Sequence, residues 1–289
     1  MNYVFMTDSD SDLPYDLKVQ YDIPVVYMPY ALNGKEYFDD LGQTVNSKEY
    51  FDAMRNGAVP ITSALNETTY LELLDPILKE QDLLFIAFSS KMSSTFRALE
   101  SARVKLLEKY PGRRFELVDT LSISGPMTLL ILKAHEMYRA GAPIDEVAAW
   151  VRNNYDRAQA FFLVDDLKYL KRGGRISSTA AALGTMLDLK PVIAETKEGT
   201  LTAVSKQRGR RKAISYLLSQ TLENLDDPKE SVFIILQADC KDEAEHLRDE
   251  LLAKVPELSI RIDNVGPVVG AHCGPGTLAC CFMGKQRPY

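Results

Sequence analysis

Apolar runs of strand length alternate with segments of helical periodicity along the first half of the chain. These runs are residues 4–6, 23–28, 83–88 and 115–119. Between the last two runs, Phe96, Leu99 and Ala102 recur at helical spacing, which predicts a helix over residues 95–110. Strand, helix and strand in this order predict a βαβ unit, and several such units favour a parallel sheet. Two more helices are expected, over residues 126–139 and 144–155.

The pattern changes after residue 157. We expect strands over residues 160–164, 189–196, 201–206, 231–237 and 259–264, of which the second and third form a hairpin. Helices are expected over residues 166–171, 210–225 and 241–255. Residues 197–200 have the composition of a hairpin turn. The sequence therefore predicts a two-domain α/β protein, with a parallel-sheet N-terminal domain over residues 1–158 and an α+β C-terminal domain over residues 159–289.

Composition narrows the class of protein. The chain has 289 residues, of which 46% are hydrophobic and 26% charged, as in soluble globular proteins. Its net charge of −6 argues against a nucleic-acid-binding surface. No apolar run approaches the ~20 residues that span a membrane, and the first residues do not resemble a signal peptide. The simplest expectation is a cytoplasmic protein whose four cysteines are free thiols, because their spacing fits no zinc pattern.

The segment over residues 266–276 carries the most candidate chemistry. Six of its eleven residues are Gly or Pro, it contains His272, and an apolar strand follows it. We expect a turn beside a buried strand, where backbone N–H groups and one titratable ring come to a defined place. The alternative is an ordinary turn with a surface histidine.

Hydroxyl side chains precede two of the expected helices. Thr62 and Ser63 come before a helix that is expected to begin near Asn66. Ser93 and Ser94 come before the helix over residues 95–110. Ligands of open α/β sheets bind beyond the carboxyl ends of the strands, and N–H and hydroxyl groups at a helix N-terminus suit an anion. Simple capping of the helices by Ser and Thr is the alternative.

Charged runs allow further interpretations. The alternating carboxylates of residues 8–12 either bind a hard cation or cap the next helix. The basic run 171–175, with Arg172 and Arg175, either complements a helix C-terminus or faces a phosphate. The run 206–212, with Arg208, is a solvated face, a docking surface or a contact with anionic lipid.

The chain lacks the sequence motifs of two enzyme classes. A hydrolase needs a nucleophile, a base and an orienting group, which Ser93, His272 and an aspartate would supply. The chain has no G-x-S-x-G motif to hold such a serine. It also lacks a Walker loop and a G-x-G-x-x-G at a strand–helix turn, which argues against nucleotide binding by these routes.

Five segments taken together resemble the DegV family, the fatty-acid-binding proteins of bacteria. Each is weak alone, but their order along nearly the whole chain is specific. They are residues 7–9, 60–63, 89–96, 164–176 and 270–276. The resemblance implies a two-domain α/β protein that holds one long-chain fatty acid in a buried tunnel between its domains. On this interpretation the protein needs no cofactor or metal and is not itself an enzyme.

The resemblance also implies roles for individual residues. Thr62 and Ser93 match the family positions that hydrogen-bond the carboxylate of the acid. Ser94 stands where the family has a glycine, so we expect its side chain either to narrow the carboxylate pocket or to add a hydroxyl contact there. His272 and Arg175 match positions near the head group of the acid.

Partners follow from the same resemblance. Some family members present the bound acid to a separate kinase, which forms an acyl phosphate, and the binding subunit then has no nucleotide site. Ser63, Arg172 and Arg208 are expected near the head group or at a contact with such a partner. A transient contact with a membrane surface is expected from the basic runs. The rival interpretation is a Ser/His hydrolase that acts on an acyl ester.

Overall fold

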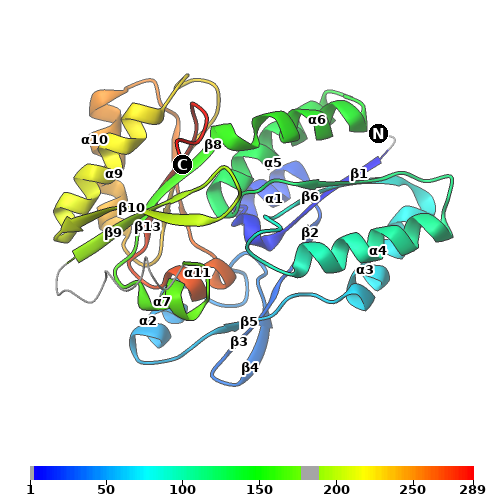
Figure 1. The fold of residues 1–289 in the computed structure, drawn as a ribbon, viewed down its shortest axis with the longest axis horizontal. Helices are drawn as coiled ribbons and strands as arrows, with labels where there is room; N and C mark the ends of the chain where they lie inside the picture. Colours follow the sequence, from blue (N-terminus) through cyan, green and yellow to red (C-terminus); the bar gives the residue numbers. More distant parts are fainter. Residues whose placement is uncertain (1–2, 177–188) are drawn as a thin grey trace.

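The computed structural model describes residues 3–176 and 189–289 of the chain (Figure 1). The first half is built on a parallel four-stranded sheet in the order β2-β1-β6-β7. Its strands are β1 (Tyr3–Asp8), β2 (Val25–Val26), β6 (Asp82–Ala87) and β7 (Phe115–Asp119). The predicted parallel sheet is confirmed, and so is the βαβ unit through α4 (Thr95–Lys109).

Helices cover both faces of this parallel sheet. Helices α3 and α4 pack together on one face, and α5 and α6 pack together on the other (Figure 1). The helices of this half are α1 (Tyr15–Tyr21), α2 (Ser47–Arg55), α3 (Glu67–Glu80), α5 (Ser124–Arg139) and α6 (Ile144–Asn154), with short 3₁₀ turns η1 (Ser9–Ser11) and η2 (Tyr155–Arg157). Residues 124–131 of α5 are all buried, because this helix also packs on a second sheet.

The second sheet has six strands in the order β10-β9-β8-β13-β11-β12. They are β8 (Ala158–Leu163), β9 (Leu189–Glu195), β10 (Leu201–Arg208), β11 (Phe233–Gln237), β12 (Ile260–Asn264) and β13 (Leu278–Met283). Helices α9 (Arg210–Asn224) and α10 (Lys241–Lys254) pack against this sheet, as does α5. The expected β9–β10 hairpin is confirmed as an antiparallel pair. A domain boundary near residue 158 stays a prediction, since α5 packs on both sheets.

A third, smaller sheet was not predicted. It has the order β4-β3-β5 and consists of β3 (Pro29–Leu32), β4 (Lys35–Phe38) and β5 (Ile61–Thr62). The strand expected over residues 23–28 is present but shorter, because only the two residues of β2 pair there. Pro24 has no N–H to donate, and the N–H of Met28 donates to Ser9 Oγ at 2.9 Å instead of to a strand.

The turn expected over residues 266–276 is also wrong, because most of this segment is the helix α11 (Pro267–Cys273). Pro267 occupies the first turn, where its missing N–H leaves no bond unmade. Gly270 is required by packing, since a Cβ there would lie 2.9 Å from the ring of Phe51. Gly274, with a φ of 81°, ends the helix. Helix α7 (Lys168–Arg172), expected two residues earlier, packs against α11.

Candidate functional site

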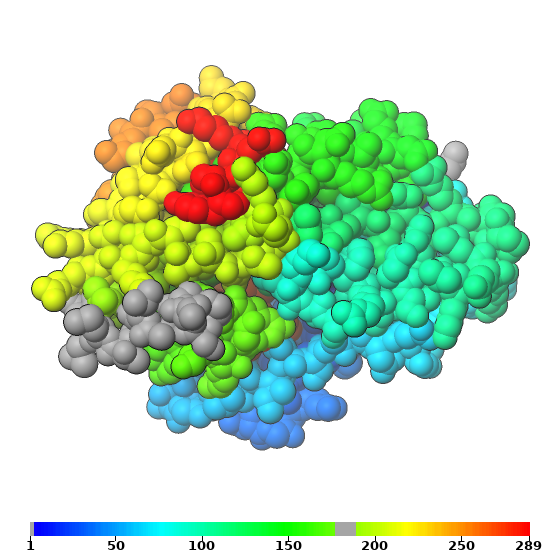
Figure 2. All heavy atoms as spheres, viewed as in Figure 1, coloured from blue at the N-terminus to red at the C-terminus, as the bar shows by residue number. Residues whose placement is uncertain are grey.

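A cavity of about 280 Å³ lies between the two halves of the chain. Figure 2 shows the halves in contact across the molecule, with the C-terminal residues, in red, at their junction. The cavity is bounded by the carboxyl-end loops of the parallel sheet, the start of α5, α11 and the mixed sheet. Much of its wall is apolar, with Phe88, Phe162, Leu170, Leu236, Val268 and Ala279 among the lining residues. Such a space suits an apolar ligand.

Thr62 and His272 meet at one end of this cavity. Thr62 lies on β5, which the pairing of Thr62 with Tyr30 holds against β3. His272 lies on α11, and its Nε2 is 3.0 Å from Thr62 Oγ1, at hydrogen-bond distance. These residues are 210 positions apart in sequence, so the fold brings together two of the predicted site residues.

His272 is held tightly and without charge. Burial, together with the positive charges of Arg175 and Arg172, lowers its pKa to about 4. Its Nδ1 is buried and has no hydrogen-bond partner among the described residues. Gly173, at the end of α7, makes room for the ring, because a Cβ there would lie 2.1 Å from Nδ1. At neutral pH the imidazole therefore offers hydrogen-bonding nitrogens rather than a positive charge.

Ser93 and Ser94 line the same end of the cavity, at the N-terminus of α4. Ser93 Oγ accepts a hydrogen bond from the N–H of Thr95 at 3.1 Å, so capping, the alternative interpretation, also holds for this serine. Ser94 is exposed and its side chain makes no capping bond. Ser63 is exposed too and also lines the cavity. Exposed lining residues identify this end as the mouth, and the start of α4 favours an anion there.

Arg175 brings positive charge to the mouth. It lines the cavity and is partly buried, and burial lowers its pKa, while the carboxyl group of Asp10 opposes that effect. Asp10 lines the cavity as well, and burial raises its pKa to about 7 although Arg175 lowers it. The guanidinium of Arg175 also donates to the carbonyl of Gly173. Sequence reasoning did not place Asp10 in this site.

The other two arginines lie outside the cavity wall. Arg172 is exposed, and its guanidinium lies 5.4 Å from the centre of the Tyr169 ring, next to the α7–α11 contact. Its charge reaches the site only through its effect on the pKa of His272. Arg208 is the exposed last residue of β10 and does not line the cavity.

The acidic run over residues 8–12 caps local structure. Asp8 is the N-cap of η1, and its Oδ1 accepts from the N–H of Asp10 at 3.2 Å. Ser11 donates back to the carbonyl of Asp8 at 2.7 Å. Residues 3–176 and 189–289 contain no group of three or more His, Cys, Asp or Glu side chains placed to bind a metal ion. The structure therefore favours the capping interpretation over a cation site.

A buried ion pair near the cavity was missed by sequence reasoning. Glu195, the last residue of β9, lines the cavity, and its Oε2 accepts from Arg287 at 2.7 Å. A glutamate at a strand end and an arginine two positions before the last residue resemble surface residues. The two residues are 92 positions apart in sequence, and only the fold brings them together.

The hydrolase interpretation gains no support from this geometry. Within the described residues no hydrogen bond joins Ser93 to His272, and no carboxylate orients His272 Nδ1. A serine nucleophile needs both contacts. His272 contacts Thr62 instead.

Comparison with known proteins identifies the family. The family model described as "Uncharacterised protein, DegV family" matches residues 3–285. The chain belongs to the DegV family. A DegV domain-containing protein of Clostridium perfringens is 36% identical over 286 residues, which cover 99% of this chain and 98% of that protein. The resemblance inferred from the five segments is thereby confirmed.

Solved DegV structures share the whole fold. A DegV family protein of Thermus thermophilus, described by its fatty acid binding, has a TM-score of 0.85 at 32% identity, covering 97% of this chain and 99% of its own. A fatty acid binding DegV family protein of Streptococcus agalactiae has a TM-score of 0.86 at 26% identity, covering 99% of this chain and 100% of its own. The predicted α/β class, with a parallel sheet and a separate mixed sheet, is confirmed. No helix of the described residues is long and apolar enough to cross a membrane.

Proposed function

We propose that this DegV protein binds one long-chain fatty acid in the cavity between its halves. The observation that carries the proposal is the division of the cavity into a polar mouth and a largely apolar interior. The carboxylate lies at Thr62, Ser93, Ser94 and His272, and the alkyl chain runs inward past Phe162 and Leu236. Two related proteins of this fold are described as fatty acid binding, which supports the same ligand class.

The mouth suits a carboxylate on physical grounds. Removing a carboxylate from water requires hydrogen-bond donors in its place. Hydroxyl groups of Thr62 and Ser93, the neutral ring of His272 and the start of α4 can donate without burying a second bare charge. Arg175 adds positive charge at the same end, where Asp10 already offsets part of it.

We also propose that the protein presents the acid rather than transforming it. Ser63 and Ser94 are exposed at the mouth, so a carboxylate held there faces outward. A separate kinase that forms an acyl phosphate could reach it, and the protein itself would need neither a cofactor nor a catalytic group. Arg208 and the exposed residues that follow it offer positive charge to such a partner or to an anionic membrane surface.

Lipid analysis of the natively purified protein tests the ligand class. We expect one long-chain fatty acid per chain, detected by extraction and mass spectrometry. Protein purified without lipid that also takes up no long-chain acid would contradict the proposal. Turnover of acyl esters by the same preparation would point to the hydrolase instead, so ester hydrolysis is measured in parallel.

A further inference from the structure

The deep end of the cavity carries an ion pair where an apolar wall would be expected. Along β8, the lining residues Phe162 and Ala160 lead away from α7, α11 and the polar mouth. The register of β8 and β9 puts Glu195 beside Ala160 at this end. Glu195 lines the cavity, whereas its partner Arg287 does not. Glu195 therefore forms the cavity wall at the Ala160 end of β8, which we infer to be the floor of the cavity.

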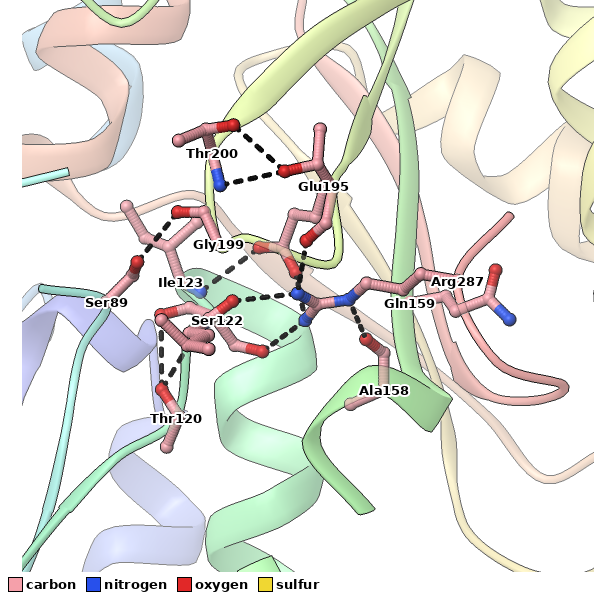
Figure 3. Close-up of polar contacts among 12 residues, drawn as sticks. Ser89, Thr120, Ser122, Ile123, Ala158, Gln159, Glu195, Gly199, Thr200 and Arg287 are labelled. Atoms are coloured by element: carbon pink, nitrogen blue, oxygen red, sulfur yellow. Dashed lines mark hydrogen bonds and ion pairs between the residues drawn. The ribbon is translucent and has the colours of Figure 1, made fainter. Parts of the chain in front are cut away.

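Arg287 uses all five of its N–H groups in hydrogen bonds (Figure 3). It donates to the carbonyls of Ala158, Leu121 and Thr196 at 3.0, 2.8 and 2.9 Å, to the hydroxyl of Ser122, and to Glu195 Oε2 at 2.7 Å. The side chains of Arg287 and Glu195 are each 1% exposed. The guanidinium therefore has no N–H group left without a protein partner.

Glu195 is held from the opposite side as well. The N–H of Ile123 donates to its Oε1 at 3.1 Å (Figure 3). The contacts of the pair thus join the loop before α5, the ends of β8 and β9, and the C-terminal segment. Hydrogen bonds between charged partners are the strongest of their kind, so an alkyl chain cannot displace this floor without large loss. Arg287 lies beyond residue 285, where the match to the family model ends.

We propose that Glu195 and Arg287 are the chain-length stop of the cavity. The terminal methyl group of the acid comes to rest against the pair, and acids too long for the space are rejected. This inference rests on the fatty-acid binding proposed above. Each buried methylene raises affinity by about fourfold, whereas breaking one hydrogen bond to a charged group lowers affinity by about one to two orders of magnitude. Affinity should therefore rise with chain length and then drop sharply.

Competition binding with saturated acids from lauric to arachidic acid tests this stop. The variant Glu195→Ala/Arg287→Leu removes both charges, so that neither is left buried and unpaired. In the wild-type protein we expect a rise and then a sharp drop in affinity along the series. In the variant the drop should move to longer acids. A drop that stays at the same acid in the variant would overturn the proposal.

The ion pair of Arg157 and Glu230 provides a matched control. It joins at 2.5 Å, Arg157 also donates to the carbonyl of Gly284 near the C-terminal segment, and neither residue lines the cavity. Arg157→Leu/Glu230→Ala should leave the drop where it is in the wild-type protein. If this control moves the drop equally, loosening of the C-terminal segment is the cause and the stop is refuted.

A second variant keeps the test decisive if the first does not fold. Arg287→Lys retains the charge but cannot make five bonds from a planar group, so we expect the drop to move in the same direction. An unchanged drop in this variant refutes the stop. Wild-type protein that binds none of the acids would refute the proposed function itself, whereas binding with an unmoved drop refutes only the stop.

Discussion

At the scale of single residues, the mouth of the cavity depends on hydrogen bonds more than on charge. His272 is neutral at physiological pH because burial and two neighbouring arginines depress its pKa. The charge of Arg175 is partly offset by Asp10. A ligand carboxylate would therefore depend on hydroxyl and ring donors, of which Thr62 and Ser93 are half-buried whereas Ser63 and Ser94 are exposed.

Replacing both Thr62 and Ser93 by alanine should weaken fatty-acid binding and leave the fold intact. Each lost donor to a charged group costs about 1–3 kcal/mol, and affinity falls about tenfold for every 1.4 kcal/mol. Titration of a fluorescent fatty acid measures the change. Thr68→Ala/Ser219→Ala is the matched control, because both residues are exposed on helices away from the cavity. Equal affinity in the two double variants would mean that the carboxylate lies elsewhere.

The sequence could predict the mouth of the site but not its floor. Thr62, Ser63, Ser93 and Ser94 are polar residues just before helices, and such local patterns are visible in a sequence. Glu195 and Arg287 carry no local signal, since their meaning depends on a contact across 92 residues.

At the scale of elements, the contact between α7 and α11 fixes the position of His272. The end of α7 comes so close to the His272 ring that only glycine fits at position 173. This packing explains Gly173, whose φ is −73°. Gly174, with a φ of 70°, has the left-handed conformation expected of a glycine after a helix. Any side chain at position 173 must push the imidazole away from Thr62.

Gly173→Ala should therefore lower fatty-acid affinity by about tenfold or more, as expected for one lost hydrogen bond to a charged group. Backbone strain does not enter, because alanine readily adopts this φ. Gly112→Ala is the control, since a Cβ there would meet nothing within 4 Å. Isothermal titration of both variants makes the comparison. Unchanged affinity in Gly173→Ala would show that His272 takes no part in binding.

The segment around η1 makes stability depend on pH. Burial raises the pKa of Asp10 and of Asp12 to about 7, and that of Asp39 well above its usual range, with Asp12 and Asp10 adding repulsion at Asp39. Burial also raises the pKa of the neighbouring Asp8, whereas the positive charge of Arg175 lowers the pKa of Asp10. Because these carboxyl groups hold their protons more tightly in the folded state, the free energy of unfolding is higher at acidic pH. It falls as pH rises toward about 7, where these groups become charged in the folded protein.

Asp39→Asn should flatten this loss of stability. One carboxylate oxygen of Asp39 is buried with no partner among the described residues, so the neutral amide removes an uncompensated charge. We expect the variant to be more stable than wild type by over about 1 kcal/mol at pH near 8 and by less at pH near 5. Urea unfolding at both pH values measures the difference. Asp40→Asn, at the next and partly exposed position, is the control, and an equal effect there would refute this assignment.

Periodicity explains which elements could be predicted. The helix α4 and the strands β6 and β7 have regular patterns that match a local period, and each was predicted within a few residues. Strands β3, β4 and β5 have two to four residues each, too few to show a period. Helix α11 has the composition of a turn, because one of its glycines serves close packing and its proline starts the helix.

At the scale of the whole molecule, a net charge of −6 coexists with a local concentration of positive charge. Around the junction of β10 and α9, the side chains of Arg208, Arg211 and Lys212 are exposed. Arg210, in the same run, is instead held by Glu243 at 2.7 Å and by the carbonyl of Gly276. We propose that these three exposed cations form a docking surface, and the alternative is a solvated face.

Reversing Arg208 and Arg211 to glutamate should separate binding from delivery. Neither residue lines the cavity, so fatty-acid affinity should stay at the wild-type value. Transfer of the acid to anionic vesicles should slow, most strongly at low salt, because charge at a rim acts on the rate of encounter and is screened by ions. Stopped-flow transfer across a salt series measures this. Glu223→Arg/Glu245→Arg, which adds charge of the opposite sign on α9 and α10, controls for net charge. Equal transfer rates for wild type and the Arg208→Glu/Arg211→Glu variant at every salt concentration would show that these residues are only a solvated face.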